Sequence, residues 1–162
     1  MNLLFNKIIL HHSKTKDSGT VSWDAIRKYH IETNGWKDIG YEFGIEQVGL
    51  KSQVMIGRPL TEYGSHCAGH NTGSVGIVTV GDFDSEKLSL EKELLLVDLC
   101  VSVCLTLGVN PKEIYGDRDF HPTKTCPGNV FPLRRIKENV VRVYTSYQGI
   151  RTMLSNELKL EK

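Results

Sequence analysis

The sequence predicts an α/β domain in which one mixed β-sheet is flanked by helices on both faces. Short apolar or alternating runs, typical of strands, interleave with segments of helical periodicity in the order β-α-β-β-β-α-β-α. The chain has 162 residues, of which 40% are hydrophobic, so it can bury a core of its own. No internal repeat or low-complexity segment interrupts this pattern, and we therefore expect a single domain.

The first strand is expected at residues 7–13, where the apolar run KIIL leads into two histidines and a serine. A helix then begins near Ser22, whose hydroxyl can cap the first turn. Asp24 lies in that turn, where the helix dipole favours a carboxylate. Gly35 is expected to end this helix.

A β-hairpin follows. Residues 40–49 alternate like a half-buried strand, and residues 51–57 return as the partner strand around Gly49. Residues 58–73 are rich in glycine and polar side chains, which is typical of a loop that carries function. Residues 74–81 are apolar and β-branched, and therefore predict a central strand.

The longest helix is expected at about residues 90–107, with Ser89 as its cap and Gly108 as its stop. Its apolar residues cover most of its surface, so we expect it to press against the sheet. Residues 109–116 lead through a short strand, and residues 132–147 form an amphipathic helix.

The charge and the length of the apolar stretches argue against nucleic-acid binding and against a membrane span. The net charge is +1, from 20 basic and 19 acidic residues, and no basic block stands out, so we expect no nucleic-acid binding. The longest apolar stretch, residues 94–108, contains Asp98 and is too short to span a bilayer.

The first residues lack a basic segment, a sustained apolar core and a cleavage site, so we expect no signal peptide and synthesis in the cytoplasm. Thiols there stay reduced, and most of the cysteines are expected to be small buried side chains. The four cysteines are Cys67, Cys100, Cys104 and Cys126.

Residues 116–128, GDRDFHPTKTCPG, concentrate polar side chains between two prolines and two glycines, which indicates a well-held loop. Cys126 in this loop and His11 at the end of the first strand are far apart in sequence. Imidazole and thiolate from separate segments are the ligands that a folded zinc site uses. Side chains in the loop that can bind metal or carry charge are Asp117, Asp119, His121, Lys124 and Cys126.

Four segments resemble, in the same order, the signature blocks of the zinc-dependent N-acetylmuramoyl-L-alanine amidases. This family shares its fold with peptidoglycan-recognition proteins and includes the lysozyme-like amidases of bacteriophages. The resemblance runs from about residue 7 to residue 140. The blocks are IILHHS (8–13), GWKDIGYEFGI (35–45), GSHCAGHNTGSVGI (64–77) and GDRDFHPTKTCPG (116–128).

The resemblance implies roles for individual residues. His11 and Cys126 match zinc ligands of the family. Tyr41 and Lys124 match polar residues that the family places beside the metal, where they would act in catalysis. The remaining matches, His66 and Asn71, would line the groove that receives the muramyl peptide.

Two positions depart from the family pattern. Asp117 stands where the family usually has a third ligand, a histidine. Asp117 can ligate zinc itself through an oxygen, or His121 can supply the missing imidazole. In a third reading the metal site is weak and the domain binds peptidoglycan without cleaving it, or the aspartate is an introduced substitution in an active enzyme. The second departure, Glu42 after the tyrosine, is expected to be silent because it should face away from Tyr41.

These observations combine into one interpretation. Residues 1–147 form an amidase domain, and residues 148–162 form a C-terminal extension that can add one more helix. The resemblance implies Zn2+ as cofactor and peptidoglycan as partner. The small size, the near-neutral charge and the expected lack of a signal peptide indicate a monomeric phage endolysin that acts on the bacterial cell wall. A bacterial amidase that recycles wall fragments in the cytoplasm fits the same residues. A cysteine protease using Cys126 and His11 is a competing class, which recovery of activity with zinc after chelation would exclude.

Overall fold

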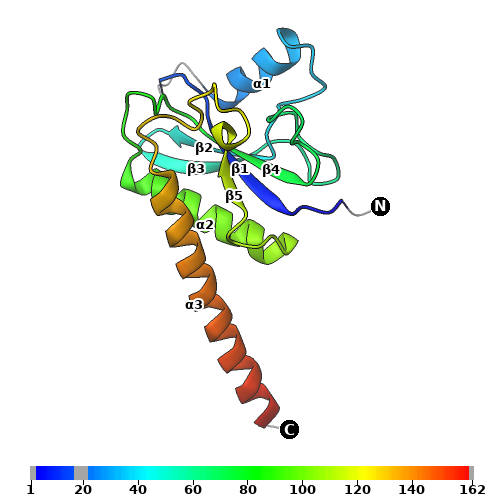
Figure 1. Cartoon of the computed structure of the whole chain (residues 1–162), viewed down its shortest axis with the longest axis vertical. Coiled ribbons are helices and arrows are strands. Elements are labelled where there is room, and N and C mark those ends of the chain that lie inside the picture. Colours follow the sequence, from blue (N-terminus) through cyan, green and yellow to red (C-terminus); the bar gives the residue numbers. More distant parts are fainter. Residues whose placement is uncertain (1–2, 17–21, 161–162) are drawn as a thin grey trace.

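The computed structural model describes residues 3–16 and 22–160 (Figure 1). Residues 1–2 and 17–21 of the expected domain, and residues 161–162 of the expected extension, lie outside this part. The strands are β1 (Lys7–His12), β2 (Phe43–Val48), β3 (Lys51–Ile56), β4 (Ser74–Thr79) and β5 (Ile114–Gly116). The helices are α1 (Trp23–Glu32), α2 (Leu90–Leu107), the 3-10 helix η1 (Asp117–Asp119) and α3 (Leu133–Leu160).

The five strands form one mixed sheet in the order β3-β2-β4-β1-β5. β1 pairs in parallel with β4 and β5, β2 pairs in parallel with β4, and β2 and β3 form the antiparallel hairpin. β4 is buried along its whole length, as is typical of a strand with parallel neighbours and both faces covered. The predicted single mixed sheet is confirmed.

Helices cover both faces of the sheet. α2 and α3 pack over one face, where Ile8 and Leu10 of β1 join the main core. α1 lies on the other face, where Trp23 forms a second cluster with Ile39 and Val78. Because side chains alternate along a strand, His11 lies on the α1 face, level with Val78.

The helix ends follow their local sequence. Ser22 caps α1 by accepting a hydrogen bond from the backbone N–H of Ala25, and Ser89 caps α2 in the same way. α2 ends at Gly108, which adopts the left-handed conformation, with φ of 72°. α1 ends earlier than Gly35, because Thr33 is its C-cap.

α3 is longer than the sequence pattern indicates. Residues 148–160 continue α3 to Leu160, so the expected additional helix is not a separate element. The run contains no proline that would end the helix. Its last turns extend away from the sheet (Figure 1), and Ile150 and Leu154 are exposed there. Within residues 3–16 and 22–160, no helix has the length and apolar character needed to cross a membrane.

We expect the two halves of α3 to differ in their contribution to stability. Ile136 is fully buried in the main core, whereas Ile150 is 57% exposed. Ile136→Ala should lower the free energy of unfolding by about 2–5 kcal/mol because it leaves a cavity. Ile150→Ala should change it by no more than about 0.5 kcal/mol. Urea unfolding followed by circular dichroism measures both, and equal losses would contradict the packing described.

Candidate metal centre

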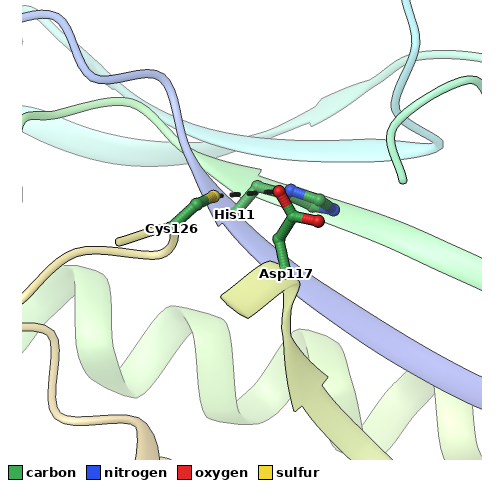
Figure 2. Close-up of side chains that lie close together, drawn as sticks. All are labelled: His11, Asp117 and Cys126. Atoms are coloured by element: carbon green, nitrogen blue, oxygen red, sulfur yellow. Dashed lines mark hydrogen bonds between the residues drawn. The ribbon is translucent and has the colours of Figure 1, made fainter. Parts of the chain in front are cut away.

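Three side chains with metal-binding atoms converge on the α1 face of the sheet (Figure 2). They are His11 from β1, Asp117 from η1 and Cys126 from the loop that follows η1. Their ligand atoms all lie within 4.8 Å of one another, and Cys126 Sγ lies 3.5 Å from His11 Nδ1. Imidazole, carboxylate and thiolate are all ligands of borderline divalent metals.

The strand pairing brings these residues together. β1 and β5 run side by side in parallel, and Leu10 is level with Gly116. His11 and Asp117 are the next residues of the two chain segments, so they lie next to each other. The backbone N–H of Arg118 donates to the carbonyl of Cys126 over 2.9 Å, which ties the distant cysteine to η1. Asp119 accepts from the backbone N–H of Gly116 and helps to hold the turn.

The separations suit a metal ion. Metal–ligand distances of about 2.0–2.3 Å place tetrahedral ligand atoms about 3.3–3.6 Å apart. The 3.5 Å between Cys126 and His11 falls in this range. Both His11 and Asp117 are buried, with 2% and 3% of their surface exposed. The chemistry of the donor set and the spacing of Cys126 and His11 therefore fit a divalent cation.

Burial sets the charges of these groups. It lowers the pKa of His11 well below its ordinary value and raises the pKa of the Cys126 thiol to about 12. Burial also opposes ionisation of Asp117, but hydrogen bonds from Lys124 and His121 outweigh it and lower the pKa of that carboxyl. The site therefore holds a neutral imidazole and a carboxylate, with a thiol that needs a metal in order to ionise.

Asp117 has more partners than the sequence indicated. Its Oδ1 lies 2.7 Å from His121 Nδ1 and accepts from the Cys67 thiol over 3.2 Å. Its Oδ2 accepts from Lys124 Nζ over 2.9 Å. Sequence reasoning missed Cys67, because a single cysteine in a glycine-rich loop is by default a small buried side chain. No spacing signal joins it to a residue 50 positions away.

Tyr41 lies beside the cluster. Its ring centroid is 5.3 Å from that of His11. Burial raises the pKa of its phenol above the ordinary value, so the hydroxyl remains a proton donor at neutral pH. The Lys124 side chain is 47% exposed and reaches the same cluster from the solvent side.

A buried chain of contacts extends from the far side of His11. His11 Nε2 lies 3.0 Å from His66 Nδ1, and His66 Nε2 lies 3.3 Å from Ser74 Oγ and 3.7 Å from a carboxylate oxygen of Glu42. The side chains of His66 and Glu42 are fully buried. The ring of His66 thus lies beneath the surface and behind His11, and its expected place in the substrate groove stays a prediction.

Glu42 is not silent, contrary to the sequence expectation. Its two oxygens accept from the backbone N–H groups of Gly64 and Gly76, each over 2.6 Å. Burial outweighs these bonds and raises the pKa of Glu42 to about 7. Glu42 precedes the first residue of β2, so strand alternation does not direct its side chain away from Tyr41.

Asn71 is part of the loop scaffold. Its Oδ1 accepts from the backbone N–H groups of His66 and Cys67, over 2.9 and 2.8 Å. His12, next to the ligand candidate His11, accepts from the backbone N–H of Phe83 and stacks on that ring, on the opposite face of the sheet.

One cavity reaches the cluster at Cys126, and a second lies beside Tyr41. The first, of about 380 Å³, is lined by His12, Lys14 and the run from Thr123 to Cys126. The other, of about 410 Å³, includes Tyr41 and residues of α1 in its wall. Cys126 and its neighbour Lys124 therefore adjoin space that a substrate can enter.

Comparison with known proteins places this geometry in a family. The family model described as N-acetylmuramoyl-L-alanine amidase matches residues 3–129. The endolysin of Escherichia phage T7 is 40% identical over 79 residues, which are 49% of this chain and 50% of that protein. The chain thus spans about half the length of this curated relative.

Two solved structures resemble the whole fold. The N-acetylmuramoyl-L-alanine amidase LysC from Clostridium intestinale is 28% identical, with a TM-score of 0.75 over 86% of this chain and 87% of that one. The bumblebee peptidoglycan-recognition protein PGRP-SA is 29% identical, with a TM-score of 0.71 over 85% and 84%. Because the family model covers well over half of the chain, this protein belongs to the N-acetylmuramoyl-L-alanine amidase family.

Proposed function

We propose that this protein hydrolyses the amide bond between N-acetylmuramic acid and L-alanine in peptidoglycan, with zinc as cofactor, and that it acts on the bacterial cell wall as a phage endolysin. The observation that carries the proposal is the convergence of His11, Asp117 and Cys126, with Cys126 in the wall of a cavity of about 380 Å³. The similarity to the T7 endolysin and to LysC supports this reaction and this setting.

His11, Asp117 and Cys126 are the residues that would hold zinc. Three protein ligands are typical of catalytic zinc sites, and a nitrogen, oxygen and sulfur set suits this metal. When bound, zinc supplies Lewis-acid polarisation of a carbonyl and lowers the pKa of water.

His11 is prepared for this task by its neighbour. With the His11 proton on Nε2, that N–H donates to His66 Nδ1, and Nδ1 of His11 stays free to face Cys126. His66 then carries its own proton on Nε2, where Ser74 Oγ can accept it. His66 is therefore a positioning residue, and Asn71 acts in the same way by fixing the backbone of the His66 loop.

Lys124 and Tyr41 provide the polar chemistry. Lys124 lines the 380 Å³ cavity beside Cys126, so its ammonium group can stabilise the negative charge that develops on the amide oxygen. The protonated Tyr41 phenol, which lines the second cavity, can orient the attacking water by a hydrogen bond.

A second function, recognition of peptidoglycan without cleavage, is favoured by one observation. Asp117 stands where the family resemblance implies a histidine ligand. The similarity to the recognition protein PGRP-SA, at 29% identity and a TM-score of 0.71, is consistent with this function. In that case the same cavities would bind muramyl peptides.

Cleavage of purified peptidoglycan separates the two functions. The protein should release stem peptides with a free L-alanine amine, detected by mass spectrometry. EDTA should abolish this release and added Zn2+ should restore it, because the reaction needs the metal. Binding to the wall without release under any metal condition would refute the amidase and support recognition.

Removal of the candidate thiolate ligand should abolish activity. We expect Cys126→Ala to lower kcat/KM by more than about 100-fold, because the metal loses one of three protein ligands. The matched control is Cys100→Ala, since Cys100 is buried in α2 away from the cluster. Circular dichroism verifies folding, and full activity of Cys126→Ala would exclude the proposed ligand set.

Lys124 should affect turnover rather than metal binding. Lys124→Met is expected to lower kcat by about 10²–10³-fold, the usual loss when one oxyanion donor is removed, with unchanged zinc content. Lys14→Met is the control, because Lys14 lines the same cavity but pairs with Asp84 instead of Asp117. Equal kinetics for the two variants would show that Lys124 has no role in the transition state.

A further inference from the structure

A second cluster of metal-capable side chains adjoins the first. It consists of Cys67 from the loop before β4, Asp117 from η1 and His121, which follows η1. Cys67 Sγ lies 3.2 Å from Asp117 Oδ1 and 3.8 Å from His121 Nδ1, and these two atoms of Asp117 and His121 are 2.7 Å apart. Sulfur, oxygen and nitrogen donors therefore face one another a second time.

These separations are close to those around a bound ion. Tetrahedral zinc holds its ligand atoms about 3.3–3.6 Å apart, so the two distances from Cys67 differ from this range by only a few tenths of an ångström. The Asp117–His121 pair would open by about 0.6 Å to admit an ion. His121 has 25% of its side chain exposed and can make this adjustment.

The surroundings hold the donors in place from behind. The backbone N–H of Cys67 donates to Asn71 Oδ1 over 2.8 Å, and Cys67 is 1% exposed, so its thiol has little freedom. His70 stacks on Phe120 at a centroid distance of 4.2 Å and meets the edge of the His121 ring. Such outer contacts are what orients metal-binding side chains in proteins.

We propose that Cys67, Asp117 and His121 form a second site for a zinc-like divalent cation, and that the Asp117 carboxylate bridges it to the ion held by His11 and Cys126. The second half of this statement rests on the proposed function. A carboxylate has two oxygens, and two-metal hydrolases place their ions about 3.5–4 Å apart, a distance that one carboxylate can span.

The charges of the proposed ligands are consistent with two bound cations. Two thiolates and one carboxylate offset most of the charge of two divalent cations, which leaves about one net positive charge at the pair. Lys124 now neutralises Asp117 through a 2.9 Å contact. Its side chain is 47% exposed, so it can leave Asp117 when metal binds and turn toward the 380 Å³ cavity.

Cobalt substitution tests the proposal. Metal-free full-length protein is titrated with Co2+, and the thiolate-to-cobalt absorption and the bound metal per chain are measured. We expect two Co2+ per chain in the unchanged protein. Cys126→Ala should keep one ion and roughly half of the thiolate absorption, because Cys67 still provides a thiolate to the second site.

The second site has its own variants. Cys67→Ala and, separately, His121→Ala should each lower the content to one Co2+ per chain, while Cys126 retains its thiolate absorption. Cys100→Ala is the matched control, because it removes a thiol that is buried in α2 away from both clusters, and should keep two. Circular dichroism verifies that each variant is folded, so that a loss of metal is not attributed to unfolding; the side chain of His121 is 25% exposed.

A content of one Co2+ in the unchanged protein, unaffected by Cys67→Ala, would overturn the proposal, and so would Cys126→Ala protein with no thiolate absorption. Either result leaves the proposed amidase function standing, provided that EDTA still abolishes the cleavage of peptidoglycan and Zn2+ still restores it. If the protein binds two Co2+ but cleavage of peptidoglycan is absent or does not respond to EDTA and Zn2+, the proposed function is refuted and the second site is retained.

Discussion

The parallel pairing of β1 with β4 and β5 is the constraint on which the rest of the structure depends. It places the apolar residues of β1 in the main core through one face and directs His11 through the other. It also brings the end of β5 beside β1, so η1 starts next to His11. One strand therefore anchors the core and supplies a ligand candidate, which joins the stability of the fold to the precision of the site.

Asp117 is the electrostatic centre of the site. A buried carboxylate is costly unless charged or hydrogen-bonding groups compensate it, and here Lys124, His121 and Cys67 all contact its oxygens. These contacts keep the carboxylate ionised and ordered in the absence of metal. Asp117 can serve more than one partner, because a carboxylate accepts at two oxygens whereas a neutral imidazole accepts at one nitrogen.

Local sequence was sufficient for the architecture and insufficient for the network around the site. Hydrophobic periodicity located the strands and helices, and the capping residues Ser22 and Ser89 marked two helix starts. The family resemblance nominated His11, Asp117 and Cys126, which the fold brings together. The partners of these residues could not be predicted, because the contacts of His66 with His11 and of Cys67 with Asp117 join positions 55 and 50 apart. The end of α3 was also missed, since no residue in its sequence stops the helix.

The two departures from the family pattern belong to one connected system. Glu42 contacts His66, His66 contacts His11, and His11 lies beside Asp117, so a carboxylate stands at each end of a chain of imidazoles. Glu42 fits only because Gly64 and Gly76 offer bare N–H groups at close range: a side chain at Gly64 would meet Glu42, and one at Gly76 would meet the His66 ring. The glycines, Glu42 and His66 therefore act as one packed unit behind His11. That unit holds the His11 ring through residues that do not contact Asp117, so the two sides of the candidate site are supported by separate parts of the structure.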